Sequence, residues 1–165
     1  MKEVILLLGG NLGDRRRMFE AAREKIAARA GCIIRRSSLY ESEAWGFASS
    51  HFFLNQVVII ATRLGPVELM ELLLGIEGEL GKRSGSSGDG YTSRVIDIDM
   101  LFYADRVMET GRVTVPHPRL HRRRFTLVPL AEVAPDFVHP VFQKSVARLL
   151  EECDDPSKVY RVEGG

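Results

Sequence analysis

The order of the apolar segments along the chain is the feature that most limits what it can fold into. Asp14 is a suitable N-cap for a first helix, and Pro66 is a suitable first residue for a second one. In chain order, the patterned segments are strand 4–8, a helix that begins at 15 and is closed by Gly31, strands 32–40 and 52–62, helix 66–81 and strand 95–103. The predicted order is therefore strand, helix, strand, strand, helix, strand.

This β-α-β-β-α-β order is typical of a ferredoxin-like α+β fold, with the helices packed on one face of an antiparallel sheet. Residues 82–93, KRSGSSGDGYTS, contain three glycines and four serines without apolar periodicity, so we expect a loop that can close over a site. After a last substantial segment that begins at 112–115, we expect proline-punctuated turns and a short helix near 145–152. Residues 154–165 are expected to form a polar tail.

The composition is that of a single globular domain over residues 1–165. With 45% apolar and 27% charged residues, the chain can bury a core without a disulfide or a structural metal. A formal net charge of +1 argues against a surface devoted to nucleic acid or to a membrane. Cys32 and Cys153 lie far apart, and no apolar run approaches the ~20 residues of a membrane span. We expect a cytoplasmic protein and a monomer, whose electrostatic function is local.

Two carboxylates in strand 95–103 share one face. Apolar residues alternate through this strand, so Asp97 and Asp99 must lie on the opposite face, about 7 Å apart along the strand. Oxygen-only ligation of this kind suits Mg²⁺, which takes one or two carboxylates together with substrate phosphates. The alternative is an edge strand with a solvated acidic face.

A basic run follows this strand. Residues 110–131 contain arginines and histidines without a single acid, and Arg94 comes directly before the strand. Cationic donors around a two-carboxylate metal site are what phosphoryl transfer requires. Arg122, Arg123 and Arg124 cannot all point one way, so at least one of them is expected to be only solvated. The alternatives are a solvated basic turn and a patch that binds nucleic acid.

An aromatic segment with an amide lies between the second and third strands. Residues 42–55, SEAWGFASSHFFLN, contain the only tryptophan, Trp45, and end in Asn55. Aromatic faces beside an amide suit a flat heterocycle, because the rings stack while the amide reads a donor and acceptor edge. Phe52 and Phe53 must point to opposite faces, so only one can contact a ligand. The alternative is that these aromatics belong to the core.

Four segments together carry a resemblance to a known family: GGNLGD, SLYESEAWGFASSHFFLNQVV, RVIDIDMLFY and RVTVPHPRLHRRRFTLVPLAEVAP. From about residue 4 to residue 150, the chain resembles the 6-hydroxymethyl-7,8-dihydropterin pyrophosphokinases of folate biosynthesis. The resemblance implies transfer of the β,γ-pyrophosphoryl group of ATP to the pterin hydroxymethyl oxygen with release of AMP. It also implies a ferredoxin-like fold and two Mg²⁺ ions.

The resemblance further implies roles for individual residues. Asp97 and Asp99 match the ligands of both magnesium ions, and Arg94 matches the residue that acts on the transferred phosphates. The family's lid has another arginine that this chain lacks, and Lys82 or Arg83 is the candidate to replace it in catalysis. The implied ATP-binding residues are Glu77, Arg94, Arg112, Thr114, His117 and Arg123. The implied pterin-binding residues are Ser42, Glu43, Trp45, Phe53, Asn55 and Phe125.

Two other functions are compatible with parts of this pattern. A ferredoxin-like sheet with exposed aromatics and arginines can also bind RNA, but Asp97 and Asp99 would repel its phosphates and no RNP-type run is present. A metal-dependent phosphohydrolase would use the same carboxylates and would release phosphate or pyrophosphate from ATP without a pterin. The dependence of ATP turnover on a pterin distinguishes the pyrophosphokinase from both.

Overall fold

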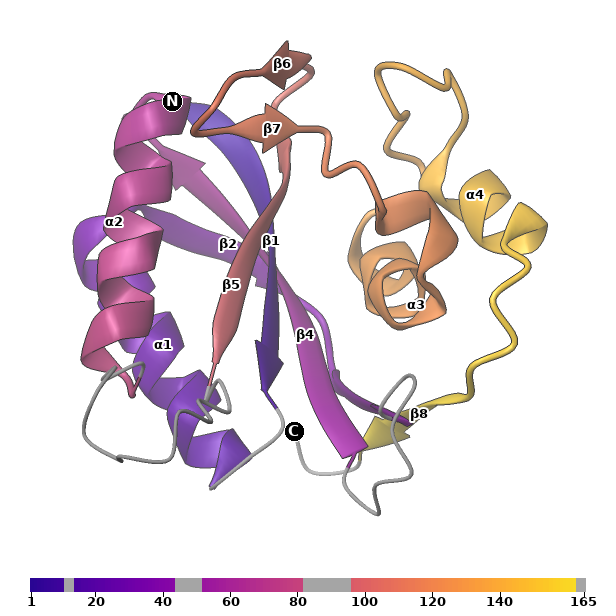
Figure 1. The fold of residues 1–165 in the computed structure, drawn as a ribbon, viewed down its shortest axis with the longest axis horizontal. Coiled ribbons are helices and arrows are strands. Elements are labelled where there is room, and N and C mark those ends of the chain that lie inside the picture. The colour runs from indigo at the N-terminus through magenta and orange to yellow at the C-terminus, as the bar shows by residue number, and fades with distance from the viewer. Residues whose placement is uncertain (11–13, 44–51, 82–95, 163–165) are drawn as a thin grey trace.

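The computed structural model describes residues 1–10, 14–43, 52–81 and 96–162 (Figure 1). Its strands are β1 (Lys2–Gly10), β2 (Cys32–Arg36), β3 (Leu39–Glu43), β4 (Phe52–Thr62), β5 (Asp97–Tyr103), β6 (Met108–Glu109), β7 (Thr114–Val115) and β8 (Val159–Val162). Its helices are α1 (Arg15–Arg29), α2 (Pro66–Glu79), α3 (Arg124–Val133) and α4 (Val146–Glu152), with a 3-10 turn at Leu120–Arg122. The main sheet has the strand order β5-β1-β4-β3-β8, and β2 also pairs with β4. Every pair in it is antiparallel, which confirms the α+β ferredoxin-like fold class.

The predicted strand 32–40 is two strands, β2 and β3, which pair with successive parts of β4. The break between them is made by Ser37. Its backbone N–H donates to the carbonyl of Val57 (2.8 Å), while its hydroxyl accepts from the N–H of Val57 (3.0 Å). Its own carbonyl accepts from the side-chain amide of Gln56 (2.8 Å). Side chains thus replace two ladder contacts, and the chain bends there without leaving buried polar groups unpaired.

Helices cover both faces of the sheet (Figure 1). Because side chains alternate along a strand, β1 sends Leu6 to the core beneath α1 and α2, and sends Leu7 to a second core beneath α3 and α4. Phe19 of α1 and Leu73 of α2 fill the first core, and Leu127 of α3 packs in the second. The expectation that helices pack on one face only is therefore wrong, because a second apolar surface on the sheet also needs a cover.

α3 is the helix that the sequence did not predict. The prolines around it indicate turns, and Pro129 lies inside the helix, where proline removes one backbone hydrogen bond. The helix forms nevertheless, with Leu127, Pro129 and Leu130 buried against the sheet. Burial of this apolar face outweighs the weak local propensity.

The prediction of a polar tail at 154–165 is wrong for part of that segment. Val159–Val162 form β8, which pairs with β3 in the register Leu39↔Val162 to Ser42↔Val159. The exposed edge of β3 thereby gains a hydrogen-bonded neighbour. The short helix expected near 145–152 is confirmed as α4, with Ser145 as its N-cap. Among the residues that the structure describes, no helix has the length and apolar character needed to cross a membrane.

Candidate functional site

A cavity of about 690 Å³ lies between the sheet and the segment that carries α3. Its walls come from β1, β3, β4 and β5 of the sheet, from the turn and helix start at 119–125, and from the C-terminal segment after α4. The lining residues are Leu7, Gly9, Ser42, Phe53, Asn55, Asp97, Asp99, Arg119, Arg122, Arg123, Phe125, Asp154, Asp155 and Pro156. Its volume is within the range of small-molecule sites.

The acidic wall of the cavity is β5. Asp97 lies opposite Gly9 and Asp99 lies opposite Leu7 on β1, and all four residues line the cavity. Ile98, between the two aspartates, is buried in the core on the other face. The predicted sharing of one face by the two carboxylates is therefore confirmed, and both remain half-buried at the cavity surface.

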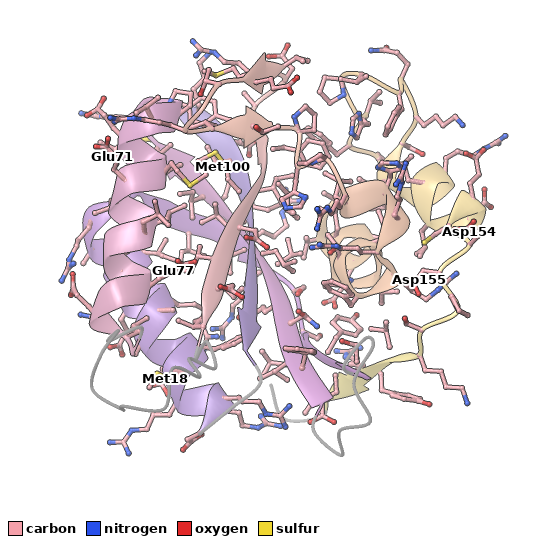
Figure 2. All side chains as sticks on the ribbon, in the orientation of Figure 1. Met18, Glu71, Glu77, Met100, Asp154 and Asp155 are labelled. Atoms are coloured by element: carbon pink, nitrogen blue, oxygen red, sulfur yellow. The ribbon has the colours of Figure 1, made fainter. Side chains whose placement is uncertain are left out.

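Glu77 lies behind this acidic wall rather than in the cavity. It belongs to α2, is only 4% exposed, and accepts a hydrogen bond from the backbone N–H of Ile98 at 2.6 Å. Figure 2 shows it on the side of α2 that faces β5. Within the described residues, β5 is at the edge of the main sheet, and no further strand accepts its outward N–H groups. Glu77 supplies the acceptor and thereby holds the backbone between the two aspartates.

The basic wall comes from the turn before α3. Arg119, Arg122 and Arg123 line the cavity. Burial lowers the pKa of Arg123, nearby Asp99 opposes this effect, and the side chain remains a cation. The guanidinium of Arg123 also lies over the ring of Phe125, 5.5 Å from its centroid. A cation and an aromatic face are therefore presented together.

Arg124 does not line the cavity. Its Nε donates to the carbonyl of Asp155 (2.9 Å) and its Nη2 to the carbonyl of Cys153 (3.0 Å). As expected, the three successive arginines do not all point one way: Arg122 and Arg123 line the cavity, whereas Arg124 turns away. Arg124 binds the C-terminal segment instead of being only solvated.

The third wall combines aromatic rings and an amide. Phe53 of β4 and Phe125 of α3 reach the cavity from elements far apart in the sequence. Asn55 is 3% exposed, and its Nδ2 donates to the hydroxyl of Ser42 at 3.1 Å. A side chain on Gly9 would place its Cβ 3.3 Å from Oδ1 of Asn55, so glycine leaves room for this amide. Asn55 is therefore held in one orientation at the cavity wall.

Besides Glu77, three of the nucleotide-binding residues that the resemblance implies lie outside the cavity lining. Arg112 is exposed and forms an ion pair with Glu71 of α2, and Thr114 is an exposed residue of β7. His117 is half-buried, and its Nδ1 accepts a hydrogen bond from the backbone of Arg119 (3.2 Å). Burial, followed by the charges of Arg123 and Arg119, lowers the pKa of His117 to about 4, so the ring is neutral at pH 7.

Several predicted residues cannot be placed by their side chains. Lys82, Arg94 and Trp45 lie outside the described residues, as does the predicted loop 82–93. Glu43 is described only as the last residue of β3.

The sequence also missed one wall of the cavity. Asp154, Asp155 and Pro156 line it from the C-terminal segment beyond α4, where Figure 2 labels both aspartates. An acidic pair in a polar segment carries no local signal for such a position. The only indirect signal was the run of arginines at 122–124, which contains more cations than one site can use.

The donor set of the cavity fits a hard cation. Asp97 and Asp99 offer carboxylate oxygens, which suit Mg²⁺, and among the described residues no cysteine or histidine lines the cavity. No cluster of three or more acidic, histidine or cysteine ligands occurs in the part of the chain that the structure describes. Two carboxylates leave most coordination positions for phosphate oxygens and water, which is the usual arrangement for Mg²⁺ on a nucleotide.

Comparison with known proteins identifies the family. The model of the 7,8-dihydro-6-hydroxymethylpterin-pyrophosphokinase (HPPK) family matches residues 5–135. The chain is 40% identical over 141 residues to a 2-amino-4-hydroxy-6-hydroxymethyldihydropteridine pyrophosphokinase of Porphyromonas gingivalis, covering 85% of this chain and 95% of that protein. It is also 40% identical to the protein of the same name from Methylorubrum extorquens, covering 99% of this chain and all of that one.

The fold has solved counterparts as well. The crystal structure of wild-type HPPK-DHPS from Plasmodium falciparum superposes with a TM-score of 0.72 at 15% identity. The match covers 92% of this chain but only 44% of that longer one, and it concerns the fold alone. Since the family model and the curated relatives both cover most of the sequence, this chain belongs to the 7,8-dihydro-6-hydroxymethylpterin-pyrophosphokinase family.

Proposed function

We propose that this chain transfers the pyrophosphoryl group of ATP to 6-hydroxymethyl-7,8-dihydropterin in the cavity between β5 and α3. The activity of an ATP-dependent pyrophosphokinase in folate biosynthesis follows from its family. In the reaction, the hydroxymethyl oxygen bonds to the β-phosphorus, the bond from that phosphorus to the α,β-bridging oxygen breaks, and AMP leaves. The observation that carries the proposal is that paired carboxylates, arginines and two aromatic rings line one cavity.

Asp97 and Asp99 are the residues that would hold the metal, and two Mg²⁺ ions are the number we propose. Bound there, magnesium would offset negative charge on the phosphate oxygens and orient the triphosphate. Each aspartate contributes a half-buried carboxylate on the same face of β5. Glu77 supports them from behind by fixing the N–H of Ile98.

The arginines form the phosphate-binding side of the site. Arg123 is the residue with most support, because it is partly buried, lines the cavity and interacts with the charge of Asp99. We propose that it offsets charge on the phosphates and that Arg119 and Arg122 assist at the rim. Arg94, with Lys82 or Arg83, would act from the segment outside the described residues.

The nucleoside part of ATP is proposed to lie along residues 112–117. This segment packs against β5 through β7, and the N–H of His117 donates to the carbonyl of Leu101 at 2.9 Å. The neutral ring of His117 accepts at Nδ1, so its Nε2–H is a donor for the ligand. Arg112 and Thr114 are exposed on the same segment, where they can contact ATP directly.

The pterin is proposed to lie between Phe53 and Phe125. Stacking on two rings accounts for affinity, and the fixed amide of Asn55 can read the donor and acceptor edge of the heterocycle. Ser42 orients that amide, and Glu43 and Trp45 would add contacts beyond the described part of the wall. The nucleophile is the hydroxymethyl oxygen of the pterin, whose proton passes to water, and no nucleophile of the protein is needed. Catalysis therefore rests on positioning and charge.

We also propose that the protein is a cytoplasmic monomer whose partners are these small molecules, with no nucleic acid or membrane involved. Both cysteines are free thiols, Cys32 exposed and Cys153 buried, which suits a reducing compartment.

The test is chromatographic detection of AMP from purified protein supplied with ATP, Mg²⁺ and 6-hydroxymethyl-7,8-dihydropterin, with a control that omits the pterin. We expect AMP only when the pterin is present. Phosphate, pyrophosphate or ADP formed equally without the pterin would support the phosphohydrolase instead. Absence of nucleotide turnover together with tight binding of single-stranded RNA would support the binding module.

A further inference from the structure

The start of α3 has no cap of its own. Its N-cap residue is Arg123, a side chain that cannot accept a hydrogen bond, and no side-chain cap is formed within the segment. The first helical residue is Arg124, whose N–H has no partner inside the helix. The helix start also carries cavity residues on both sides of Arg124, namely Arg123 and Phe125. The geometry of the site therefore depends on how this helix start is held.

Asp155 supplies the missing cap from the C-terminal segment. Its Oδ2 accepts the backbone N–H of Arg124 at 3.0 Å, across 31 residues of sequence. Its Oδ1 accepts from the N–H and the hydroxyl of Ser157, at 2.9 and 2.6 Å. A carboxylate at this position also interacts favourably with the positive end of the helix dipole.

The charge of Asp155 is maintained by these bonds. Burial raises the pKa of Asp155, but hydrogen bonds from Ser157 and from the backbone of Arg124 outweigh it, and the pKa lies below its ordinary value. The cap is thus an ionised carboxylate at neutral pH, which forms stronger hydrogen bonds than a neutral one.

The side chain of Arg124 completes a two-way attachment. While Asp155 caps the helix, the guanidinium of Arg124 donates back to the carbonyls of Asp155 (2.9 Å) and Cys153 (3.0 Å). At its other end the same segment continues into β8, where Val159 lies opposite Ser42 of β3. The C-terminal segment is therefore fixed to both walls that hold the predicted pterin-binding residues, and its residues 154–156 line the cavity between them.

We propose that Asp155 is a positioning residue for the pterin: by capping α3 from the C-terminal segment, it holds Arg123 and Phe125 at the cavity. This inference rests on the proposed function and adds a residue that acts through others. Both carboxylate oxygens of Asp155 are used in the hydrogen bonds to Arg124 and Ser157. Its effect is to keep the ring of Phe125 opposite the wall formed by Phe53 and Asn55.

The first test is the substitution Asp155→Ala, with Asp155→Asn as its conservative counterpart. Loss of the cap should raise the KM for the pterin about tenfold, with the KM for ATP changed less than threefold. Asparagine keeps a side-chain oxygen for the N–H of Arg124, so Asp155→Asn should restore the pterin KM to within about threefold of wild type. If Asp155→Ala only destabilised the fold, its melting temperature would fall and the KM values for the pterin and for ATP would change to the same extent.

Ser145→Ala is the matched control. Ser145 is the N-cap of α4, its hydroxyl accepting from the N–H of Arg148 at 3.1 Å, and it lines no part of the cavity. Its removal should reduce thermal stability to a similar extent while leaving the pterin KM unchanged. If Asp155→Ala does not fold, Arg124→Ala, which keeps the backbone cap but frees the segment, should raise the pterin KM by about threefold or more.

A pterin KM within twofold of wild type in every folded variant of Asp155 and Arg124 would overturn the proposal. An increase in the pterin KM of Ser145→Ala as large as that of Asp155→Ala would also overturn it. Equilibrium binding of 6-hydroxymethylpterin, followed by its fluorescence with a nonhydrolysable ATP analogue, separates this result from a failure of the proposed function. If the wild type binds the pterin but forms no AMP, the proposed function fails, whereas weaker binding by Asp155→Ala still supports the positioning role.

Discussion

Acidification should destabilise this fold through His139. This residue is 3% exposed, its ring stacks on Phe142 with centroids 4.3 Å apart, and it meets Phe102 edge-on at 5.5 Å. Its Nδ1 accepts the backbone N–H groups of Val141 and Phe142, both at 3.1 Å. Protonation would place a hydrogen at Nδ1, directly against two donors. Burial, followed by the neighbouring His121, lowers the pKa of His139 from the ordinary 6.5 to about 4.

The size and sign of the effect follow from that shift. Between pH 6.5 and pH 4 the unfolded chain binds a proton at His139 that the folded protein does not bind, so the free energy of unfolding falls as the pH falls. Each pH unit in this window changes it by about 1.4 kcal/mol. Lowering the pH from 7 to 5 should therefore cost about 2 kcal/mol through this residue alone. The contribution of neutral His139 to the free energy of unfolding is fully present above pH 6.5.

The assay is urea unfolding of the wild type and of His139→Asn at pH 7, 6 and 5. Asparagine places its Oδ1 close to the position of Nδ1, so it can accept the same two N–H groups but does not titrate. Both proteins share His117, His121 and the carboxylates, whose titration cancels in the comparison. Between pH 7 and pH 5 the wild type should lose about 2 kcal/mol more than the variant. Parallel profiles for the two proteins would refute the reasoning.

Three further perturbations test the site and its support. Asp99→Asn should reduce kcat for AMP formation about a hundredfold or more while the melting temperature stays within a few degrees, and an activity near that of the wild type would remove the metal role. Phe125→Ala should raise the pterin KM about tenfold and Phe125→Leu less, as measured by initial rates with each substrate varied while the other is saturating. Equal increases in the KM values for pterin and ATP would contradict stacking. Thr62→Val should lower the free energy of unfolding by about 2 kcal/mol. The buried hydroxyl of Thr62 donates to the carbonyl of Ala30 (2.6 Å) and accepts the N–H of Leu64 (3.0 Å). A denaturant titration in which Thr62→Val is as stable as Thr62→Ser would contradict this.

Local patterns were sufficient where one short segment contains the whole signal. Alternation of side chains in β5 predicted that Asp97 and Asp99 share a face, and this is confirmed. Continued alternation would place Phe102 with Ile98 and Met100, but the register shifts between Ile5 and Leu6 of β1, which leaves Leu101 as an extra residue. Phe102 consequently packs in the second core rather than with Ile98 and Met100. A bulge of this kind depends on the partner strand, which the local sequence does not reveal.

Features that depend on distant pairing were not predicted. α3 forms because its apolar face covers the sheet, although Pro129 lowers its local propensity. β8 forms because β3 offers it an edge, and the two strands are separated by more than a hundred residues. The missed cavity wall has the same origin, since Asp155 is held at the site by contacts with Arg124, 31 residues away in the sequence. Glu77, which the resemblance assigns to the nucleotide, is buried behind β5 and bonds the backbone of Ile98. That position also depends on a residue distant in the sequence.

The most direct test of the central claim is ³¹P NMR of the products from equal amounts of ATP and 6-hydroxymethyl-7,8-dihydropterin with Mg²⁺. The account predicts AMP and a diphosphate ester of the pterin in equal amounts, with two coupled phosphorus signals from the ester and no inorganic phosphate. It also predicts that Asp97→Asn abolishes both products. ADP with a monophosphorylated pterin, or free pyrophosphate with unmodified pterin, would contradict it.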